Sequence, residues 1–343
     1  MRTPSGGSRR SGRGRLAARK SAFATGPRGT FALVMQSFEE NGVPMERWKV
    51  GASTYETCLT RGARLLRWKL DVPTGHREIL FWPGGAPMEL DKIGHVRGGN
   101  PILFPFMGRN YADGEKFAWK AADGIKRPMP QHGFARDAAF EIVESGPKHA
   151  VVRLVQDDRG RNCYPFAYDF RIRFDFLELF LRITFEFENR DSKPLPWCAG
   201  HHFYFTLPWH AGLSRRDYVI KIPSKKQWRH AADGKLVPFA ELKGASEIGF
   251  DNPHLSDCIF TNLKSATLSF GPKSGEEDIT VKVGEEAIPG SWATVVTWTA
   301  DPEAPFYCVE PWMGPPNSPE HKNGLRFAEP GQVDTFVTEV SLM

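Results

Sequence analysis

The sequence predicts an all-β fold of large antiparallel sheets with few short helices. Turn-forming dipeptides such as Pro-Gly and Asp-Gly recur along the chain, and they separate short runs of aromatic and β-branched residues of strand length. The 343 residues include 25 Phe and 10 Trp, a composition that suits sheet faces. No segment keeps apolar residues at the spacing i, i+3, i+4, i+7 for three turns, which argues against long amphipathic helices.

Residues 168–189 give the clearest local prediction, a β-hairpin. Apolar side chains occupy even positions up to Phe176 and odd positions from Leu179 to Phe187, with charged or polar residues between them. Side chains of one strand alternate between two faces, so a strand cannot change the parity of its buried positions midway. The chain is therefore expected to turn near Leu177-Glu178, and each strand is expected to bury one face.

Further strands are expected where apolar and β-branched residues cluster between turns. The segments are 148–156, 201–206, 217–222, 292–299 and 305–310. The last is expected to end at Glu310, because Pro311 has no N–H to contribute to a sheet ladder. Since the sequence has no internal repeat and no clear linker, residues 35–343 are predicted to form a single β-sandwich domain.

Residues 1–34 are predicted to be a basic, disordered tail. The first 30 residues carry eight Lys or Arg and no acidic residue. Subtracting these eight from the formal charge of +5 leaves −3 for the remainder, so no domain-wide basic face indicates a nucleic-acid partner. An Arg- and Ser-rich, acid-free segment also resembles an organelle transit peptide, and Met35 is an alternative start site.

Cysteine usage and hydropathy indicate a cytoplasmic protein. The five cysteines are odd in number and form no CxxC pair, which favours free thiols in a reducing compartment. No apolar run reaches the roughly 18 residues that cross a bilayer, so no membrane partner is expected. The sequence has no HxH or HExxH spacing, no GxSxG elbow and no nucleotide phosphate loop. We therefore expect neither a metal ion nor a cofactor.

Three short stretches, far apart in the chain, carry the residues with catalytic potential. They are Gln-His-Gly-Phe-Ala-Arg at 131–136, Gly-His-His-Phe-Tyr-Phe at 200–205 and Val-Glu-Pro-Trp at 309–312. One carboxylate base and one imidazole acid are the minimum set for moving protons on and off a small neutral molecule near pH 7. The candidates are therefore Glu310, His132 and His202, each with the alternative of a purely structural role.

Strand alternation distinguishes the two adjacent histidines. In a strand over 201–206, His202 shares a face with a tyrosine, and His201 shares the other face with two phenylalanines. The phenylalanine face is expected to be the core face, so His202 is expected to point toward a cleft or solvent. Glu310, at a strand end beside Trp312, is expected to be partly desolvated, which raises the proton affinity of a carboxylate.

These stretches resemble the aldose 1-epimerase (mutarotase) family, in particular its branch of hexose-6-phosphate epimerases. Residues 97–105 (Arg-Gly-Gly-Asn-Pro-Ile-Leu-Phe-Pro) are similar to the signature Arg-Gly-Gly-x-Pro-x-x-Phe-Pro. The stretches at 130–136, 202–205 and 309–316 match that branch's Gln-His-Gly-Phe-Ala-Arg, His-x-Tyr-Phe and Glu-Pro-Trp in order. A Pro-Gly pair before the last expected strand also fits, and the resemblance covers about residues 50–343.

The resemblance implies a galactose mutarotase-like supersandwich and the interconversion of α and β anomers of an aldose. By the matched motifs, Glu310 would remove the proton of the C1 hydroxyl and His202 would protonate the ring oxygen. His132 would hydrogen-bond near the ring oxygen, and Arg97 would bind sugar hydroxyls. The other expected substrate-binding residues are Gln131, Trp312, Arg109, Arg136 and Asp257, with Asp251 as the alternative to Asp257.

The expected partner is a small sugar or sugar phosphate, bound by a monomer or weak dimer. Arg97, Arg109 and Arg136 could form a basic pocket for a phosphate, but the sequence does not identify the sugar. Phe203 stands where many relatives carry Pro or Thr. Two other functions stay open: a sugar-binding module without turnover, and a carbohydrate lyase or hydrolase, which would need a second carboxylate near Glu310.

Overall fold

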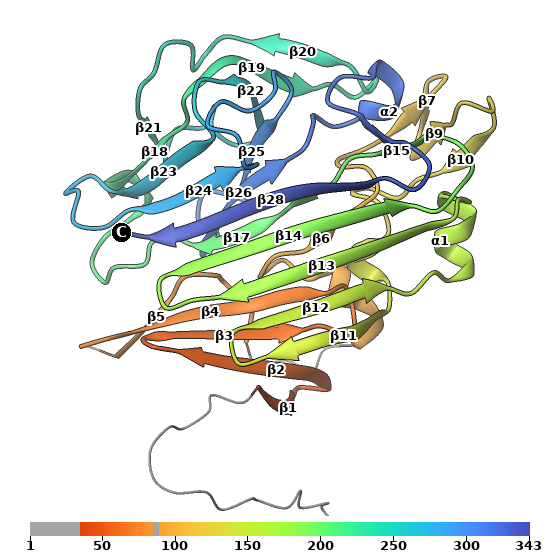
Figure 1. Cartoon of the computed structure of the whole chain (residues 1–343). Helices are drawn as coiled ribbons and strands as arrows, with labels where there is room; N and C mark the ends of the chain where they lie inside the picture. Colours follow the sequence, from red (N-terminus) through yellow and green to blue (C-terminus); the bar gives the residue numbers. More distant parts are fainter. Residues whose placement is uncertain (1–34, 74, 85–88) are drawn as a thin grey trace, which may run out of the picture. The chain divides into compact units, whose positions relative to one another are not determined.

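Antiparallel sheets make up most of the computed structural model, which describes residues 35–73, 75–84 and 89–343 (Figure 1). The predicted all-β class is confirmed, and the helices are few and short. Within the described ranges they are α1 (Asp158–Cys163), α2 (Ser318–His321) and the 3-10 turns Leu90–His95, Ala135–Asp137 and Arg215–Asp217. The predicted tail, residues 1–34, lies outside the described residues.

Three sheets contain most of the strands. The first has the order β1 (Gln36–Glu40), β2 (Val43–Val50), β3 (Ser53–Cys58), β4 (Arg64–Val72), β5 (Gly75–Glu78). The nine-stranded sheet has the order β11 (Phe140–Gly146), β12 (His149–Leu154), β13 (Tyr168–Phe176), β14 (Phe180–Asn189), β28 (Val333–Leu342), β24 (Ile279–Val283), β23 (Thr267–Pro272), β18 (Tyr218–Lys221), β21 (Ile248–Gly249). The eight-stranded sheet has the order β20 (Leu236–Phe239), β19 (Ser224–His230), β22 (Cys258–Leu263), β25 (Thr294–Trp298), β26 (Phe306–Trp312), β16 (Gly200–His201), β6 (Ile102–Leu103), and β17 (Phe203–Thr206) also pairs with β26. The remaining strands form the pairs β7 (Tyr111–Ala112) with β8 (Glu115–Lys116), β9 (Ala118–Lys120) with β10 (Lys126–Pro128), and β15 (Leu195–Trp197) with β27 (Arg326–Ala328).

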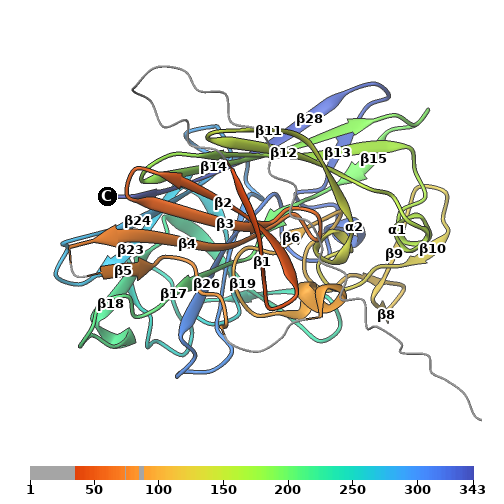
Figure 2. The same ribbon diagram turned by 90° about the horizontal axis from the view of Figure 1, so that it is seen from below.

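The nine-stranded and eight-stranded sheets lie on opposite sides of a shared hydrophobic core. Figure 2 shows β13 and β14 on one side and β19 and β26 on the other. Phe205 of β17 contacts Phe270 of β23 across the core, with ring centroids 4.9 Å apart. Phe104, just after β6, stacks on Phe170 of β13 at 4.0 Å. Full burial of each such ring contributes about 1.5–3 kcal/mol, so the core fixes where the strands carrying the site lie.

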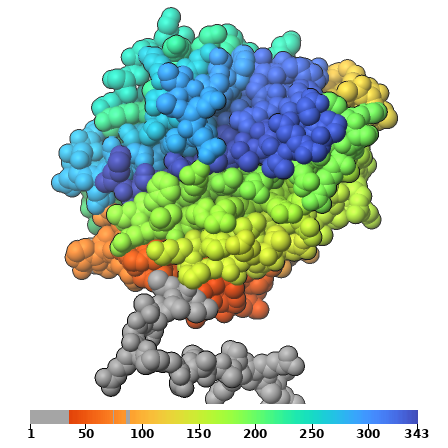
Figure 3. Space-filling view, in the orientation of Figure 1, coloured from red at the N-terminus to blue at the C-terminus, as the bar shows by residue number. Residues whose placement is uncertain are grey.

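The predicted hairpin is confirmed as β13 and β14. The apolar side chains at the alternating positions from Ile172 to Phe187 are fully buried, with one exception. Leu179, which was expected in the second strand, is 43% exposed in the turn, because the chain uses residues 177–179 to reverse direction. The polar positions form the outer face seen in Figure 3, where they make surface ion pairs along and between strands.

Two predicted strand boundaries are wrong. β26 does not end at Glu310 but continues to Trp312, with Pro311 inside it. The expected strand over 201–206 is interrupted: β16 ends at His201, His202 belongs to neither strand, and β17 begins at Phe203. The two deviations have one physical cause: a proline cannot donate to a ladder, so it is accommodated where the neighbouring strand is broken.

Two glycines let the loops of the Arg-Gly-Gly and Gln-His-Gly motifs approach backbone closely. Gly99 has φ +62°, and a Cβ there would lie 2.3 Å from the Leu65 carbonyl oxygen. Gly133 has φ +75°, and its Cβ would lie 1.9 Å from the Phe104 carbonyl oxygen. Only glycine fits such positions. The second loop is then held against the first, since the Phe134 N–H donates to the Phe104 oxygen at 2.9 Å.

All five cysteines are buried, and each is a free thiol. Burial raises the pKa of Cys198 to about 12, which keeps that thiol protonated and unreactive at neutral pH. Over the ranges that the structure describes, no helix has both the length and the apolar character needed to span a bilayer.

Gly200→Ala is expected to destabilise the protein and displace Trp312. A Cβ at Gly200 would lie 2.5 Å from Cδ1 of Trp312, so the indole or the strand must shift, and overpacking of this kind costs roughly 1–3 kcal/mol. Urea unfolding and tryptophan fluorescence measure the two effects. Gly290→Ala is the control, because a Cβ at Gly290 meets open space. Equal stability of the two variants would contradict the prediction.

Candidate active site

A cavity of about 540 Å³ brings together all nine site residues that the sequence predicts. They are Arg97, Arg109, Gln131, His132, Arg136, His202, Asp257, Glu310 and Trp312. Asp251, the alternative to Asp257, lines a neighbouring depression instead. The sequence analysis did not single out four other lining residues: His95, Arg229, His230 and Trp298.

His202 and Glu310 face each other across neighbouring strands. β16 and β17 pair with β26 in one continuous register, and that register places His202 opposite Glu310. The two side chains are buried, and His202 Nε2 lies 3.4 Å from Glu310 Oε1. The His202 ring also stacks on Tyr204, with centroids 4.8 Å apart. The sheet itself therefore fixes the relative position of the imidazole and the carboxyl group.

Glu310 is a carboxyl group with an unusually high proton affinity. Burial raises its pKa well above the ordinary value, and the nearby Asp257 raises the pKa further. Its Oε2 atom has no hydrogen-bond partner among the described residues, so little offsets the desolvation of the charged form. A carboxyl group in such surroundings retains its proton at a pH where an exposed glutamate has lost it.

His202 has the opposite tendency. Burial, together with the charges of Arg136 and Arg64, lowers its pKa to about 3. The contact at 3.4 Å is therefore between a protonated carboxyl group and a neutral imidazole rather than within a standing ion pair. One proton serves both groups, and its transfer from Glu310 to His202 yields a carboxylate and an imidazolium. The pair can thus act as base and acid together.

Asn100 determines which of the adjacent histidines faces the cavity. Its side-chain oxygen accepts a hydrogen bond from the His202 N–H at 3.0 Å, and its Nδ2 lies 3.0 Å from His201 Nδ1. His201 is fully buried and packs on Phe185, with ring centroids 4.4 Å apart. As strand alternation predicts, His201 lies in the core and His202 in the cavity.

His132 is held as a hydrogen-bond donor toward the cavity. The Gly108 N–H donates to His132 Nδ1 at 3.2 Å, so the neutral ring carries its hydrogen on Nε2. Burial lowers the pKa of His132 well below its ordinary value, which keeps the ring neutral. Gln131 Nε2 is placed 3.3 Å from the ring Nε2. Two donors cannot share a hydrogen bond, so the Gln131 amide is better oriented with its oxygen toward the ring.

Positive charge predominates in the cavity. The Arg97 guanidinium lies over Trp298 at 5.4 Å, and Arg136 lies 4.0 Å from Asp137. Neither Arg97 nor Arg109 has a carboxylate within 4 Å among the described residues. Arginines without an acidic partner can bind an anionic group of a ligand. The cavity is therefore suited to a ligand that carries a negative charge.

Arg64, which the sequence analysis missed, holds the loop that carries Arg97. It is fully buried, and its guanidinium donates to three backbone carbonyl oxygens between residues 93 and 98. The bonds to the oxygens of Val96 and Gly98 are both 2.5 Å. Burial lowers the pKa of Arg64 to about 10, so it is still charged at neutral pH. No sequence motif surrounds Arg64, and only the fold reveals this role.

Arg229 holds the loop that carries Asp257, also through hydrogen bonds to backbone carbonyl groups. Its guanidinium donates to the carbonyl oxygens of Ser256 and of His254, the latter at 2.8 Å, and lies over the Phe239 ring at 4.0 Å. Asp257 has φ +57°, a left-handed conformation that is unfavourable for residues other than glycine. The hydrogen bonds from Arg229 to the carbonyl groups of His254 and Ser256 help to hold Asp257 in this conformation.

Glu310→Gln is expected to make the protein more stable at neutral and alkaline pH. The folded-state pKa of Glu310 is raised above its ordinary value of 4.5, so folded wild-type protein binds a proton that the unfolded chain releases. Its free energy of unfolding therefore falls as pH rises from about 4.5 toward the folded-state pKa. Glu310→Gln removes this loss, which should amount to about 1–3 kcal/mol by pH 8.

Urea unfolding at pH 4.5 and pH 8 measures this effect. The difference between wild type and Glu310→Gln should be near zero at pH 4.5 and grow with pH. Glu329→Gln, at an exposed position, is the matched control and should show no such growth. A difference that stays constant between the two pH values would contradict the raised pKa.

Comparisons with known proteins agree with the fold. The model of the aldose 1-epimerase family matches residues 51–341. A galactose mutarotase-like protein from Clostridium acetobutylicum has a similar structure (TM-score 0.73, 17% identity, covering 91% of this chain and 99% of that one). A galactose mutarotase related enzyme from Lactobacillus acidophilus is similar too (TM-score 0.69, 20% identity, 87% and 97%), as is a Synechocystis protein (TM-score 0.69, 21% identity, 90% and 95%). These structures share the predicted galactose mutarotase-like fold, and the chain belongs to the aldose 1-epimerase family.

Proposed function

We propose that this protein interconverts the α and β anomers of a hexose or hexose phosphate. The observation that carries the proposal is the buried Glu310–His202 pair, because the proton that it shares lets one group act as base and the other as acid. Membership of the aldose 1-epimerase family supports epimerase chemistry in general. The cavity volume of about 540 Å³ is in the range of small-molecule sites.

The proposed reaction needs two proton transfers. Once the shared proton has moved from Glu310 to His202, against the pKa shifts of both groups, the Glu310 carboxylate takes the proton of the C1 hydroxyl while the bond between C1 and the ring oxygen breaks, and His202 gives its proton to the ring oxygen. C1 becomes an aldehyde and the ring oxygen a hydroxyl. Rotation about the C1–C2 bond presents the other face of the aldehyde, and the reverse transfers close the ring. Each cycle restores the pair, so no co-reactant is consumed.

Other cavity residues would orient the sugar. The Nε2–H group of His132, which the Gln131 amide oxygen accepts in the free site, would donate to the ring oxygen region or a neighbouring hydroxyl when a sugar displaces that amide. Asp257 would accept a hydrogen bond from a hydroxyl group. The Trp312 side chain is fixed by its Nε1–H bond to the His201 carbonyl oxygen at 3.0 Å, so its ring would provide a rigid apolar wall.

The cavity's charge favours a phosphorylated hexose over a neutral one. Arg97, Arg109, Arg136 and Arg229 line it, whereas Asp257 and Glu310 are its acidic residues. Arg229 already binds backbone carbonyl groups, which leaves Arg97 and Arg109 as the best candidates for a phosphate. The hexose-6-phosphate epimerase branch that the motifs resemble is consistent with this preference.

The alternative is a carbohydrate-binding module without turnover. A buried acid and base of complementary proton affinity are not needed for binding alone, which argues for the enzyme. A hydrolase would use Asp257 and Glu310 as its two carboxylates, because both residues line the cavity. Measurements of anomer exchange, sugar binding and glycoside hydrolysis distinguish the three functions.

Anomer exchange measured by NMR is expected to be fast with wild type and slow with Glu310→Gln. Freshly dissolved α-glucose, α-galactose and glucose 6-phosphate are the substrates. Loss of one positioned acid or base typically lowers a rate by roughly 10²–10⁴-fold, and His202→Gln should show a similar loss. Asp251→Asn is the control, since Asp251 lies outside the cavity.

Saturable sugar binding without faster exchange in wild type would favour the binding module. Release of a free sugar from a methyl glycoside would favour the hydrolase. Full activity of Glu310→Gln would exclude the proposed base.

Arg109→Met is expected to raise KM for glucose 6-phosphate and to leave the kinetics of glucose nearly unchanged. A hydrogen bond to a charged group contributes about 1.5–3 kcal/mol, equivalent to roughly 10- to 100-fold in binding. Initial rates over a range of each sugar's concentration provide the measurement. Arg173→Met, on the outer face of β13, is the control. Equal effects on the phosphorylated and the neutral sugar would argue against phosphate recognition by Arg109.

A further inference from the structure

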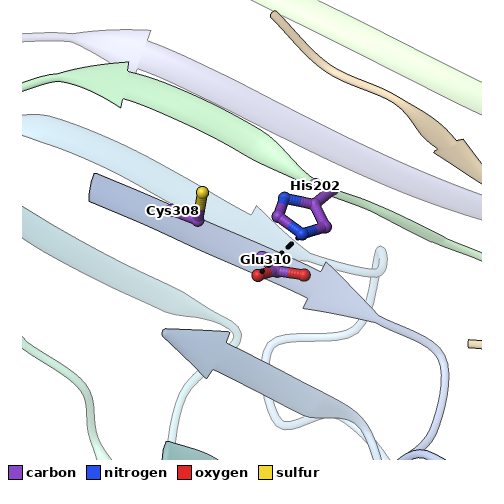
Figure 4. A group of neighbouring side chains, drawn as sticks. All are labelled: His202, Cys308 and Glu310. Carbon is purple, nitrogen blue, oxygen red and sulfur yellow. Dashed lines mark ion pairs between the residues drawn. The ribbon is translucent and has the colours of Figure 1, made fainter. Parts of the chain in front are cut away.

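A third side chain with a metal-binding atom lies beside the acid–base pair. Cys308 and Glu310 are two residues apart on β26, so they project from the same face of the strand, and His202 approaches from the neighbouring segment (Figure 4). His202, Cys308 and Glu310 each offer one ligand atom, and these atoms all lie within 4.8 Å of one another. Imidazole nitrogen, thiolate sulfur and carboxylate oxygen form a typical donor set for zinc.

The donor atoms have few competing interactions. Glu310 Oε2 and His202 Nδ1 are buried without hydrogen-bond partners in the described part of the chain, and the Cys308 side chain is fully buried. Tyr204 and Trp298 flank Cys308 on the strands that pair with β26, so the thiol is confined next to the pair. An ion bound by Glu310 would give the buried carboxyl group a partner and would displace few existing bonds.

We propose that Zn²⁺ binds to His202, Cys308 and Glu310 and blocks the acid–base pair. Bonds of about 2.0–2.3 Å to a tetrahedral zinc ion place ligand atoms about 3.3–3.8 Å apart, so the widest separation here must contract by about 1 Å. Small side-chain rotations achieve this, because His202 Nε2 and Glu310 Oε1 are already 3.4 Å apart. The fourth zinc position faces the cavity and holds water.

The proton balance of binding is simple. The thiol loses its hydrogen to solvent as the Zn–S bond forms, and the proton shared by Glu310 and His202 also leaves as the Zn–O and Zn–N bonds form. The resulting unit of one Zn²⁺, one thiolate and one carboxylate has no net charge, which suits a buried position next to arginines. Mg²⁺ prefers six oxygen ligands in octahedral geometry and does not fit.

The consequence is inhibition rather than catalysis. The bound ion occupies the two groups that the proposed epimerase reaction uses, so zinc and sugar exclude each other. The inhibition rests on the proposed function, whereas the binding of zinc does not. The sequence analysis expected no metal because no two histidines have metal-ligand spacing. In the fold, the three donors are brought together by strand pairing, which sequence spacing does not reveal.

Binding is tested directly with Co²⁺ and Zn²⁺ on the purified full chain. Wild type should give the absorption of a thiolate-to-cobalt charge transfer, and Zn²⁺ should bleach it. Competition with a chromophoric chelator measures zinc affinity, which should fall by at least about 10- to 100-fold in Cys308→Ala and Cys308→Ser. Cys163→Ala is the matched control, because Cys163 is a buried thiol in α1, outside the cavity. Thermal melts verify that each variant is folded.

Inhibition of anomer exchange by Zn²⁺ is measured with the same proteins. Zn²⁺ should inhibit anomer exchange by wild type and Cys163→Ala, EDTA should restore it, and Cys308→Ala should be active but resistant to zinc. Absence of the cobalt–thiolate band in wild type, equal zinc affinity in the two alanine variants, or equal binding of Mg²⁺ would each overturn the proposal. Cys308-dependent zinc binding in a protein without anomer exchange would uphold the metal site and refute the proposed function instead.

Discussion

The pairing of β26 with the β16–β17 segment is the constraint on which the site depends. One register runs through the interruption at His202, and it sets the imidazole opposite Glu310. The interruption exists because Pro311 cannot donate to the ladder, and Asn100 satisfies the backbone of His202 there. The geometry of the two groups is therefore as rigid as the sheet, which is what catalysis by positioned protons requires.

Burial then sets the chemistry of the pair. The same desolvation raises the pKa of Glu310 and lowers that of His202, so the shared proton rests on Glu310 and its transfer to His202 separates two buried charges. Arg64 and Arg229 donate to loop carbonyl groups and so hold the loops that carry Arg97 and Asp257. The cavity therefore combines a neutral acid–base pair with the positive charges of Arg97, Arg109 and Arg136.

The sequence allowed prediction of much of the fold and most of the candidate site, for identifiable reasons. Strand alternation around Phe176 gave the hairpin, because the buried face of a sheet imposes period two. The motifs gave the nine cavity residues, because each lies in or near a short contiguous stretch. Arg64, Arg229 and Cys308 were missed, since their roles depend on pairing between distant segments. The strand end at Glu310 was wrong, because tolerance of Pro311 depends on the neighbouring strand.

The left-handed backbone at His132 (φ +66°) and Asp257 (φ +57°) has an evolutionary consequence. Each conformation costs of order 1–3 kcal/mol for a residue with a side chain, and glycine would relieve that cost at either position. Selection for thermal stability alone would therefore favour glycine at both positions and remove the two side chains from the cavity. A histidine and an aspartate at these positions in a relative would therefore indicate selection on the cavity, and glycine at both would indicate selection for stability alone.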